Sequence, residues 1–429
     1  MSKKEQFQLM LQTGATRIQN NKIISPITQA LMAAMPITIV GAIGSLINSA
    51  PIPAYQEFLV KSQLKTITQI PSEITTNLLA LYIVFLVASK YAQQRQVEPT
   101  TAGLLALMSF FIITPFNYSE TGGMESYGIR WLGAAGLFTA FILGISVSAI
   151  YCVFRTKGWV FKMPEGVPPT IASSFAGLVP GFVIAFSAMI IRYLLSLTSF
   201  GHLHQMIFTL IASPLTSLGG SFIAIVICVL VSQLLWLVGV HGSLVVYSVM
   251  APIWTPILAA NLAAFNAGQP IPHLVSMSIF AMSSFAGGGI TIGLVFAMLR
   301  AKSEQYRTLG KLALVPNLVG INEPVIFGLP LVMNLTMAVP FVLVPLLVTI
   351  SCYLAMVTGF LPRIPGINAP LGTPIVLHGA LMGATWKWGA FQLVMVILSY
   401  LVYHPFFKVL DNIAYAEEQA VTIEAVAGD

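Results

Sequence analysis

Long apolar runs separated by short polar segments fill the chain from about residue 27 onward. Most approach the roughly 20 residues that a helix needs to cross a bilayer. They are continuous, unlike the alternating strands of an outer-membrane barrel. The pattern predicts an all-α polytopic membrane protein with about ten transmembrane helices. The expected spans cover approximately residues 27–47, 77–90, 101–115, 131–154, 171–195, 222–240, 244–264, 275–299, 333–354 and 391–407. The span over residues 275–299 is softened by three consecutive glycines, Gly287 to Gly289.

Two further apolar segments, residues 318–330 and 365–383, are too interrupted for ordinary spanning helices. In the first, Asn322 suits a helix N-cap, Pro324 suits a first helical turn, and Pro330 interrupts again. At about 1.5 Å per residue, such a piece falls far short of the roughly 30 Å hydrocarbon core. We therefore expect a half-helix that carries polar groups toward a buried site, and a second re-entrant hairpin at residues 365–383.

Glu323 is the only acidic residue between Glu304 and Asp411. A charge inside a bilayer costs roughly 2.5–3.5 kcal/mol on insertion scales, so an ionisable residue there is a functional candidate. The alternative is a structural cap that pairs with a neighbouring helix, but a cap alone needs only Asn322. We interpret Glu323 as a ligand for a substrate hydroxyl and as a candidate acceptor of its proton.

Composition and charge agree with a membrane protein. The chain is 57% hydrophobic and 8% charged, whereas soluble domains average about 25% charged residues. The net charge of +6 does not indicate nucleic-acid binding, because the basic residues occupy short loops, where they set membrane orientation. Lys3, Lys4, Arg17 and Lys22 predict a cytoplasmic amino terminus, and Lys408 predicts a cytoplasmic carboxyl terminus.

The interruptions all lie in the second half of the chain, which indicates two domains with different tasks. We expect residues 1–199 to form a scaffold of five transmembrane helices and residues 219–429 to hold the substrate. Residues 200–218, broken by Pro214, are too short to span the bilayer and predict an interfacial amphipathic connector.

Further polar and aromatic groups are candidates for the same site. His241 ends a span near Trp236, where it is either a substrate ligand or a simple hydrogen-bond partner of a carbonyl group. Trp236, Trp386 and Trp388 suit stacking on a sugar ring, although indoles also anchor helices at membrane interfaces. We place Trp386 in the site, while the sequence leaves open which of Trp386 and Trp388 faces the substrate. His378, in the second interrupted segment, is a weaker candidate.

The sequence holds no sign of a cofactor or a metal. Cys152, Cys228 and Cys352 lie in apolar runs without metal-binding spacing, and they predict small buried side chains rather than a disulfide. No phosphate-binding loop, dinucleotide fingerprint, zinc-protease motif or hydrolase elbow occurs in a usable context. We therefore expect neither a cofactor nor a bound metal.

Three stretches resemble a known family. They are GINEPVIFG from Gly320 to Gly328, WLVGVHG from Trp236 to Gly242, and YHPFFK near the carboxyl end. With the chain length, they resemble the membrane (IIC) subunit of the phosphoenolpyruvate-dependent sugar phosphotransferase system, in its lactose/cellobiose/N,N'-diacetylchitobiose branch. The resemblance covers nearly the whole chain, and the Asn-Glu-Pro motif is its most specific part.

The resemblance implies a fold of ten transmembrane helices, two re-entrant hairpins and interfacial amphipathic helices in the bacterial cytoplasmic membrane. It also implies a homodimer built on the amino-terminal half, and a carboxy-terminal half that holds the sugar and moves as a rigid body. Glu323 and His241 become sugar ligands near the hydroxyl to be phosphorylated. Asn322 supports Glu323, while Trp236 and Trp386 line the pocket.

The implied activity is group translocation of a disaccharide. The 6-hydroxyl of the bound sugar attacks the phosphocysteine of a cytoplasmic IIB protein, which is charged by IIA. The chain is then a sugar phosphotransferase only together with IIB, and the basic loop from Arg300 to Lys311 is a candidate docking surface. Glu323 is either a general base or only a hydrogen-bonding ligand for the 6-hydroxyl.

Two other classes compete with this interpretation. A proton-coupled disaccharide symporter also uses a membrane carboxylate, but such transporters commonly place acids and arginines on other spans, and here the interior has almost none. A channel or purely structural membrane protein leaves both interrupted segments unexplained. Neither the identity of the disaccharide nor the inward- or outward-facing state follows from these residues.

Overall fold

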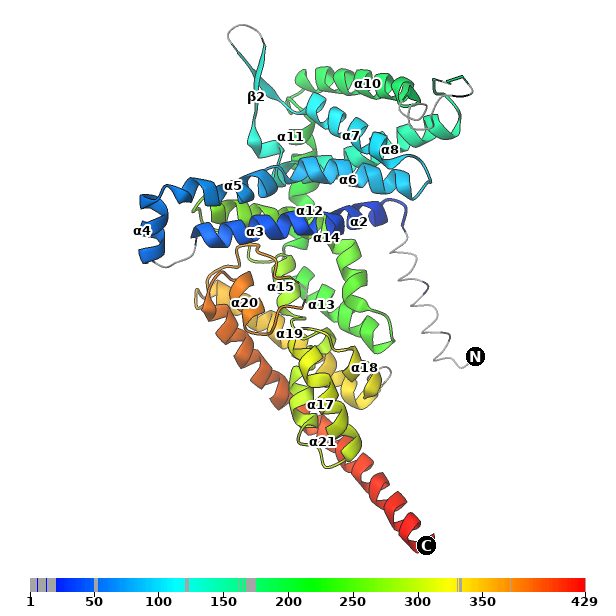
Figure 1. Ribbon diagram of the computed structural model, residues 1–429, viewed down its shortest axis with the longest axis vertical. Helices are drawn as coiled ribbons and strands as arrows, with labels where there is room; N and C mark the ends of the chain where they lie inside the picture. The colour runs from blue at the N-terminus through cyan, green and yellow to red at the C-terminus, as the bar shows by residue number, and fades with distance from the viewer. Residues whose placement is uncertain are drawn as a thin grey trace. The chain divides into compact units, whose positions relative to one another are not determined.

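The computed structural model of the chain describes residues 6, 13, 21–49, 53–119, 123–161, 163–164, 166, 175–329, 331, 334–370 and 372–428 (Figure 1). Lys3, Lys4, Arg17 and Pro330, on which some expectations rest, lie outside this range. The regular secondary structure of the described chain is helical except for one short hairpin, in which β1 pairs with β2 in antiparallel fashion. The predicted all-α class is therefore confirmed.

The chain divides into two compact units. The amino-terminal unit comprises Gln19–Gly219 and Ser248–Pro272, and the carboxy-terminal unit comprises Gly220–Tyr247 and His273–Asp429. Helix α14 (Gly242–Asn266) contributes residues to both. The elements of the amino-terminal unit are α2 (Ile24–Ala33), α3 (Met35–Ser49), α4 (Pro53–Lys61), α5 (Leu64–Thr76), α6 (Leu79–Gln93), α7 (Pro99–Ile113), β1 (Phe116–Tyr118), β2 (Met124–Tyr127), η1 (Ile129–Trp131), η2 (Ala134–Gly136), α8 (Leu137–Thr156), α10 (Leu178–Ser196), α11 (Leu203–Ile207), η3 (Phe208–Ala212) and α12 (Ser213–Gly219).

Small residues let the helices of the amino-terminal unit approach closely. Helix α6 packs against α7 and α8. A Cβ atom on Gly144 of α8 would lie 2.7 Å from a methyl group of Val87, and one on Gly103 of α7 would lie 2.6 Å from the ring of Phe85. Such small-residue contacts are typical of helix packing in membranes, where dispersion contacts rather than the hydrophobic effect hold helices together.

Six helices within the described residues are long and apolar enough to cross a membrane, or up to eight if each of two strongly bent pairs is one span. The six are Leu64–Gln93, Ala134–Thr156, Leu178–Ser196, Gly242–Asn266, Thr336–Val357 and Trp386–Ala420. This finding supports the membrane class, while the count of ten stays a prediction. Residues 203–219 are helical, with a π-helical turn at η3.

The carboxy-terminal unit packs around α16, which contacts both α17 and the long helix α21, while α13 packs against α19. Figure 1 shows the last turns of α21 extending beyond the other helices of this unit. The elements are α13 (Phe222–Leu237), α15 (Met277–Met282), η4 (Gly288–Ile290), α16 (Ile292–Met298), α17 (Glu304–Leu318), α18 (Glu323–Gly328), α19 (Leu335–Val357), α20 (Leu377–Met382) and α21 (Trp386–Gly428).

The span expected over residues 275–299, with its softening at the three glycines, is fully interrupted there. Helix α15 ends at Met282, and α16 begins only at Ile292. Between them, Gly287 and Gly289 adopt φ values of 79° and 75°, which lie in the left-handed region that a right-handed helix cannot include. The break therefore comes from backbone conformation that the apolar pattern of this segment does not reveal.

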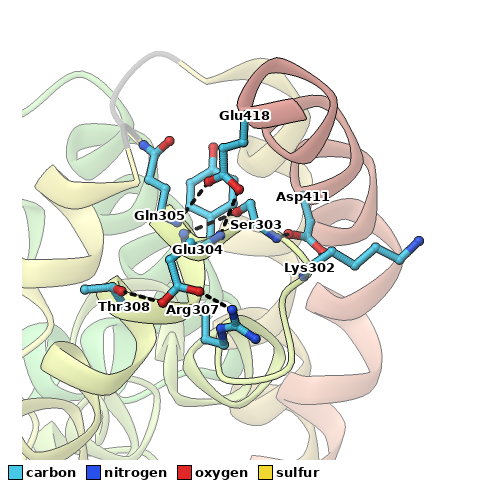
Figure 2. A network of polar contacts seen from close by, with 9 residues as sticks. Lys302, Ser303, Glu304, Gln305, Arg307, Thr308, Asp411 and Glu418 are labelled. Carbon is cyan, nitrogen blue, oxygen red and sulfur yellow. Dashed lines mark hydrogen bonds and ion pairs between the residues drawn. The ribbon is translucent and has the colours of Figure 1, made fainter. Parts of the chain in front are cut away.

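Helix α21 caps the beginning of α17. Both oxygens of Asp411 accept hydrogen bonds, from the backbone N–H groups of Lys302 at 2.9 Å and Ser303 at 3.0 Å. Glu418 accepts from the N–H groups of Glu304 and Gln305, each at 3.0 Å (Figure 2). Because the first N–H groups of a helix have no partner inside it, two carboxylates from α21 fix where α17 begins.

The substitution Asp411→Asn should destabilise the protein, because an amide offers one acceptor oxygen where two N–H groups need one each. Asp411 is buried, so one N–H group would face an NH2 group, at a cost of about 1–3 kcal/mol. The expected result is a lower thermal unfolding temperature in detergent. Glu417→Gln is the matched control, because Glu417 is exposed. Equal unfolding temperatures for the two variants would contradict the capping role.

Candidate functional site

A turn of three glycines between α15 and α16 forms the base of the site. A Cβ atom on Gly287 would lie 2.2 Å from Cγ of Asn322, and one on Gly288 would lie 2.8 Å from Nε1 of Trp236. Gly287 and Gly289 also have positive φ values. Glycine is therefore required both for the backbone conformation and for the close approach of the two side chains.

Buried polar side chains fix the same turn from other helices. Gln233 on α13 accepts a hydrogen bond from the N–H group of Gly289 at 2.9 Å, and the Tyr403 hydroxyl on α21 donates to the Gly289 carbonyl at 2.8 Å. Ser399, also on α21, donates to the carbonyl of Ile290 at 2.7 Å. In an apolar environment an unpaired backbone group is costly, so these three side chains make the irregular turn possible.

Asn322 belongs to this framework and does not cap a helix with its side chain. It stands at the N-cap position of α18 but makes no capping hydrogen bond. Its Nδ2 instead donates to the Gly288 carbonyl at 2.5 Å and to Thr291 Oγ1 at 3.1 Å. Asn317 donates to the same hydroxyl oxygen at 2.8 Å. Asn322 is thus at the expected N-cap position, but its side chain binds the glycine turn instead of capping the helix.

Glu323 begins α18 directly after this buried anchor. Pro324 follows it in the first helical turn, as the sequence predicts. Asn322 is only 2% exposed, whereas Glu323 is exposed. Within the described part of the chain, Glu323 makes no hydrogen bond or ion pair, and its carboxylate interacts electrostatically with His241. The backbone of the motif is therefore fixed while its carboxylate stays available to a ligand.

His241 and Trp236 lie side by side. Their ring centroids are 4.2 Å apart with an interplanar angle of 46°. Trp236 is buried and donates from Nε1 to Ser243 Oγ at 3.3 Å. His241 is exposed, and its Nδ1 accepts from the N–H group of Leu244 at 3.3 Å. A neutral His241 therefore carries its proton on Nε2, which makes that atom a hydrogen-bond donor.

Trp386 makes no hydrogen bond or ring contact with the other four candidate residues within the described part of the chain. It is 70% exposed, and no hydrogen bond or ring contact involves it among the residues described. Trp388 is fully buried and donates from Nε1 to the carbonyl of Pro362 at 3.1 Å. Of the two indoles, only Trp386 therefore presents a free ring surface. Its place in a substrate site stays a prediction.

The second interrupted segment is tied to the first. The N–H group of Ile375 donates to the carbonyl of Leu318, the last residue of α17, at 2.9 Å. Further along, His378 Nδ1 lies 3.0 Å from Nε2 of Gln392. Leu318 is only five positions before Glu323. This hydrogen bond therefore holds the second interrupted segment against the first.

Sequence reasoning did not find Gln233, Gln392 and Thr291, which are all buried. The two glutamines stand out in the sequence as uncharged polar residues inside apolar runs. In a membrane protein such residues usually face the interior of the bundle and hydrogen-bond there. Their position in apolar runs therefore indicates that these glutamines are buried and hydrogen-bonded, but it does not identify the groups to which they bond.

The exposed groups suit a neutral polyhydroxylated ligand. Glu323 supplies acceptor oxygens, and His241 supplies a donor beside the indole of Trp236. The carboxylate and the imidazole match the hydrogen and oxygen atoms of hydroxyl groups, while Trp236 itself is buried against His241. Within the described residues, no three His, Cys, Asp or Glu side chains lie close enough together to hold a metal ion.

Gly287→Ala should destabilise the carboxy-terminal unit more than Gly268→Ala destabilises the protein. Both glycines have positive φ, but a Cβ atom on Gly268 meets nothing within 4 Å. Each variant carries left-handed strain of roughly 1–2 kcal/mol, and only Gly287→Ala adds the clash with Asn322. Thermal unfolding in detergent measures the difference. Equal losses in the two variants would show that Asn322 does not pack tightly on the turn.

Comparisons with known proteins agree with the resemblance. Residues 28–345 match the family described as "Phosphotransferase system, EIIC". The chain is 34% identical over 431 residues to the "PTS system cellobiose-specific EIIC component" of Geobacillus stearothermophilus, covering 96% of both chains. It is 34% identical over 420 residues to the "PTS system oligo-beta-mannoside-specific EIIC component" of Bacillus subtilis (strain 168), covering 95% of this chain and 94% of that protein.

A solved structure has the same fold. It is the crystal structure of the transporter ChbC, the IIC component from the N,N'-diacetylchitobiose-specific phosphotransferase system. The TM-score is 0.87 at 34% sequence identity, and the match covers 95% of this chain and 98% of that chain.

Proposed function

The chain belongs to the phosphotransferase system EIIC family, and we propose that it binds a disaccharide and presents the sugar's 6-hydroxyl for phosphorylation. The observation that carries this proposal is the contrast between Asn322 and Glu323. Asn322 is locked into a buried framework, while the adjacent carboxylate is exposed beside His241. An exposed carboxylate on a rigid backbone is able to hold a single hydroxyl group in one orientation.

The substrate class follows from the relatives and from the chemistry of the site. Relatives are named for cellobiose, an oligo-β-mannoside and N,N'-diacetylchitobiose, which are all β-linked saccharides. In the proposed complex, Trp236 and the exposed indole of Trp386 contact the apolar faces of the sugar rings. Hydroxyl groups hydrogen-bond to Glu323 and to Nε2 of His241.

The proposed reaction takes place on the bound sugar. A carboxylate oxygen of Glu323 accepts a hydrogen bond from the 6-hydroxyl and directs its oxygen at the phosphorus of phospho-IIB. The new bond joins sugar oxygen to phosphorus, and the bond between phosphorus and the IIB cysteine sulfur breaks. The hydroxyl proton leaves as that bond forms, and Glu323 is the nearest acceptor for it among the candidate residues. IIA then restores the phosphocysteine on IIB.

The wider architecture is proposed on the same basis. Ten transmembrane helices, two re-entrant hairpins and interfacial amphipathic helices place both termini in the cytoplasm. The carboxy-terminal unit carries the sugar and moves as a rigid body against the amino-terminal unit, which forms a homodimer. The chain alone is a transporter, and it becomes part of a sugar phosphotransferase only with IIB.

The loop before α17 is proposed to dock phospho-IIB. Arg307 hydrogen-bonds to Glu304 and lowers the pKa of that carboxyl, so Glu304 stays ionised and neutralises Arg307. Lys302 and Lys311 have no such partner among the described residues. In Figure 2 the Lys302 ammonium group points away from Asp411, whose carboxylate instead binds the backbone. These two lysines, with the exposed Arg300, are therefore positive charges without an ion-pair partner in the described chain that an anionic partner protein could meet.

The double variant Lys302→Glu/Lys311→Glu should lower the rate of phosphorylation-coupled uptake and leave disaccharide affinity unchanged. The control is Arg307→Gln, because Arg307 is already neutralised by Glu304. Rates are measured in vesicles supplied with phosphoenolpyruvate and the soluble components. An unchanged rate in the double variant would remove the loop from the docking surface.

Glu323→Gln and His241→Ala should each abolish or severely reduce disaccharide binding, because each removes a hydrogen-bonding group exposed in the site. Calorimetry on purified protein in detergent, with cellobiose, lactose and diacetylchitobiose, measures the affinities. Glu417→Gln removes an exposed carboxylate elsewhere and should bind like the wild type. Thermal unfolding should be unchanged in Glu323→Gln, whose side chain makes no hydrogen bond among the described residues, while His241→Ala should still fold despite losing its bond to Leu244 and its contact with Trp236. Wild-type affinity in both would refute the assignment.

A further inference from the structure

Gln392 is a fully buried amide on α21 whose orientation is fixed by the backbone. Its Oε1 accepts hydrogen bonds from the N–H groups of Val376 at 3.0 Å and Gly379 at 2.8 Å. Two donors on one atom identify that atom as the oxygen, since an NH2 group in its place would face two N–H groups. The other end of the amide is therefore the NH2 group.

That NH2 group determines which nitrogen of His378 carries the proton. Nε2 of Gln392 lies 3.0 Å from His378 Nδ1 and 3.5 Å from the sulfur of Met282. An NH2 group donates only, so His378 Nδ1 must be the acceptor and carries no hydrogen. The neutral imidazole then has its proton on Nε2. Among the described residues, Nε2 has no hydrogen-bond partner, and the His378 side chain is only partly buried.

The backbone around His378 is held in a conformation that needs support. Val376, just before α20, has φ 78° and ψ −55°, an outlier for a β-branched residue. Its N–H group is one of the two bound by Gln392. A Cβ atom on Gly379 would lie 2.7 Å from the same Gln392 oxygen. Strained backbone of this kind persists where surrounding structure enforces it, and such positions cluster at functional sites.

His378 is attached to the framework of the candidate site from two sides. Ile375 hydrogen-bonds to Leu318, at the end of the helix that leads into Glu323. Met282, which contacts Gln392, is the last residue of α15 and directly precedes the segment with the glycine turn that binds Asn322. The second interrupted segment is therefore held by residues that lie in the first interrupted segment and next to the glycine turn.

We propose that His378 is a further sugar-binding residue, which donates a hydrogen bond from Nε2–H to an oxygen of the disaccharide, and that Gln392 is its positioning residue. The inference rests on the proposed function and adds a second donor to the one already proposed at Nε2 of His241. Glu323 accepts hydrogen bonds only, so it recognises a sugar hydrogen. His378 in this tautomer donates only, so it recognises a sugar oxygen, such as a ring, glycosidic or acetamido oxygen.

Affinity measurements separate a sugar contact from a structural role. His378→Phe keeps the ring and loses the donor, and should weaken disaccharide binding by roughly tenfold. His378→Gln, whose NH2 group reaches the position of Nε2, should recover most of that loss. Gln392→Glu turns the donor facing Nδ1 into an acceptor and should weaken binding in wild-type His378. It should have little further effect in the His378→Phe background, because the group that it orients is gone.

The tautomer gives a readout that does not depend on sugar. In the full-length protein labelled with [15N]histidine, the resonances absent from His378→Gln belong to His378. They should report a neutral ring protonated on Nε2 at pH 7, and Gln392→Glu should place a proton on Nδ1. A ring that carries its proton on Nδ1 in the wild type would overturn the inference.

The outcomes also separate this inference from the proposed function. If Glu323→Gln abolishes disaccharide binding while His378→Phe binds like the wild type, the proposed function stands and the role of His378 is refuted. If the wild type binds no disaccharide at all, the proposed function itself fails. If His378→Phe and His378→Gln lose the same affinity and both unfold at lower temperature, His378 is structural and the inference is overturned.

Discussion

The carboxy-terminal unit depends on satisfying the backbone of one buried turn. Three glycines break the helix between α15 and α16, which leaves carbonyl and N–H groups without helical partners in an apolar interior. Gln233, Ser399, Tyr403 and Asn322 supply the missing partners from three different segments. Because an unpaired buried group costs about 1–3 kcal/mol, these four side chains hold the segments to one another.

A buried amide side chain that binds backbone groups occurs at two places in this unit. At each place it holds a segment that carries a candidate ligand-binding residue. One buried amide, Asn322, anchors the segment that exposes Glu323, and another, Gln392, anchors the segment that carries His378. In the proposed site, the groups that contact the ligand are Glu323 and His378, and the buried amides only position the segments that carry them. A site built in this way is rigid before the ligand binds, which reduces the entropy lost on binding.

The sequence predicts the class of fold and the exposed part of the site better than the supports of the site. Glu323 stands out because a lone acid in an apolar run is costly, and His241 and Trp236 come together as expected. Asn322 was expected at a helix N-cap, and residues 275–299 were expected to form one span softened at the glycines. The Asn322 side chain instead holds the glycine turn, and the span is fully interrupted there, because Gly287 and Gly289 adopt positive φ. Gln392 acts through contacts far away in the sequence, which no local pattern contains.

The chemical form of the accumulated sugar tests the central claim most directly. Vesicles that contain this protein are supplied with a labelled disaccharide, phosphoenolpyruvate and the soluble IIA and IIB proteins. The account predicts a disaccharide 6-phosphate inside the vesicles, which appears only when the phosphate donor and both proteins are present and which is lost in Glu323→Gln. Accumulation of free disaccharide driven by a proton gradient, with no phosphorylated product, would contradict it.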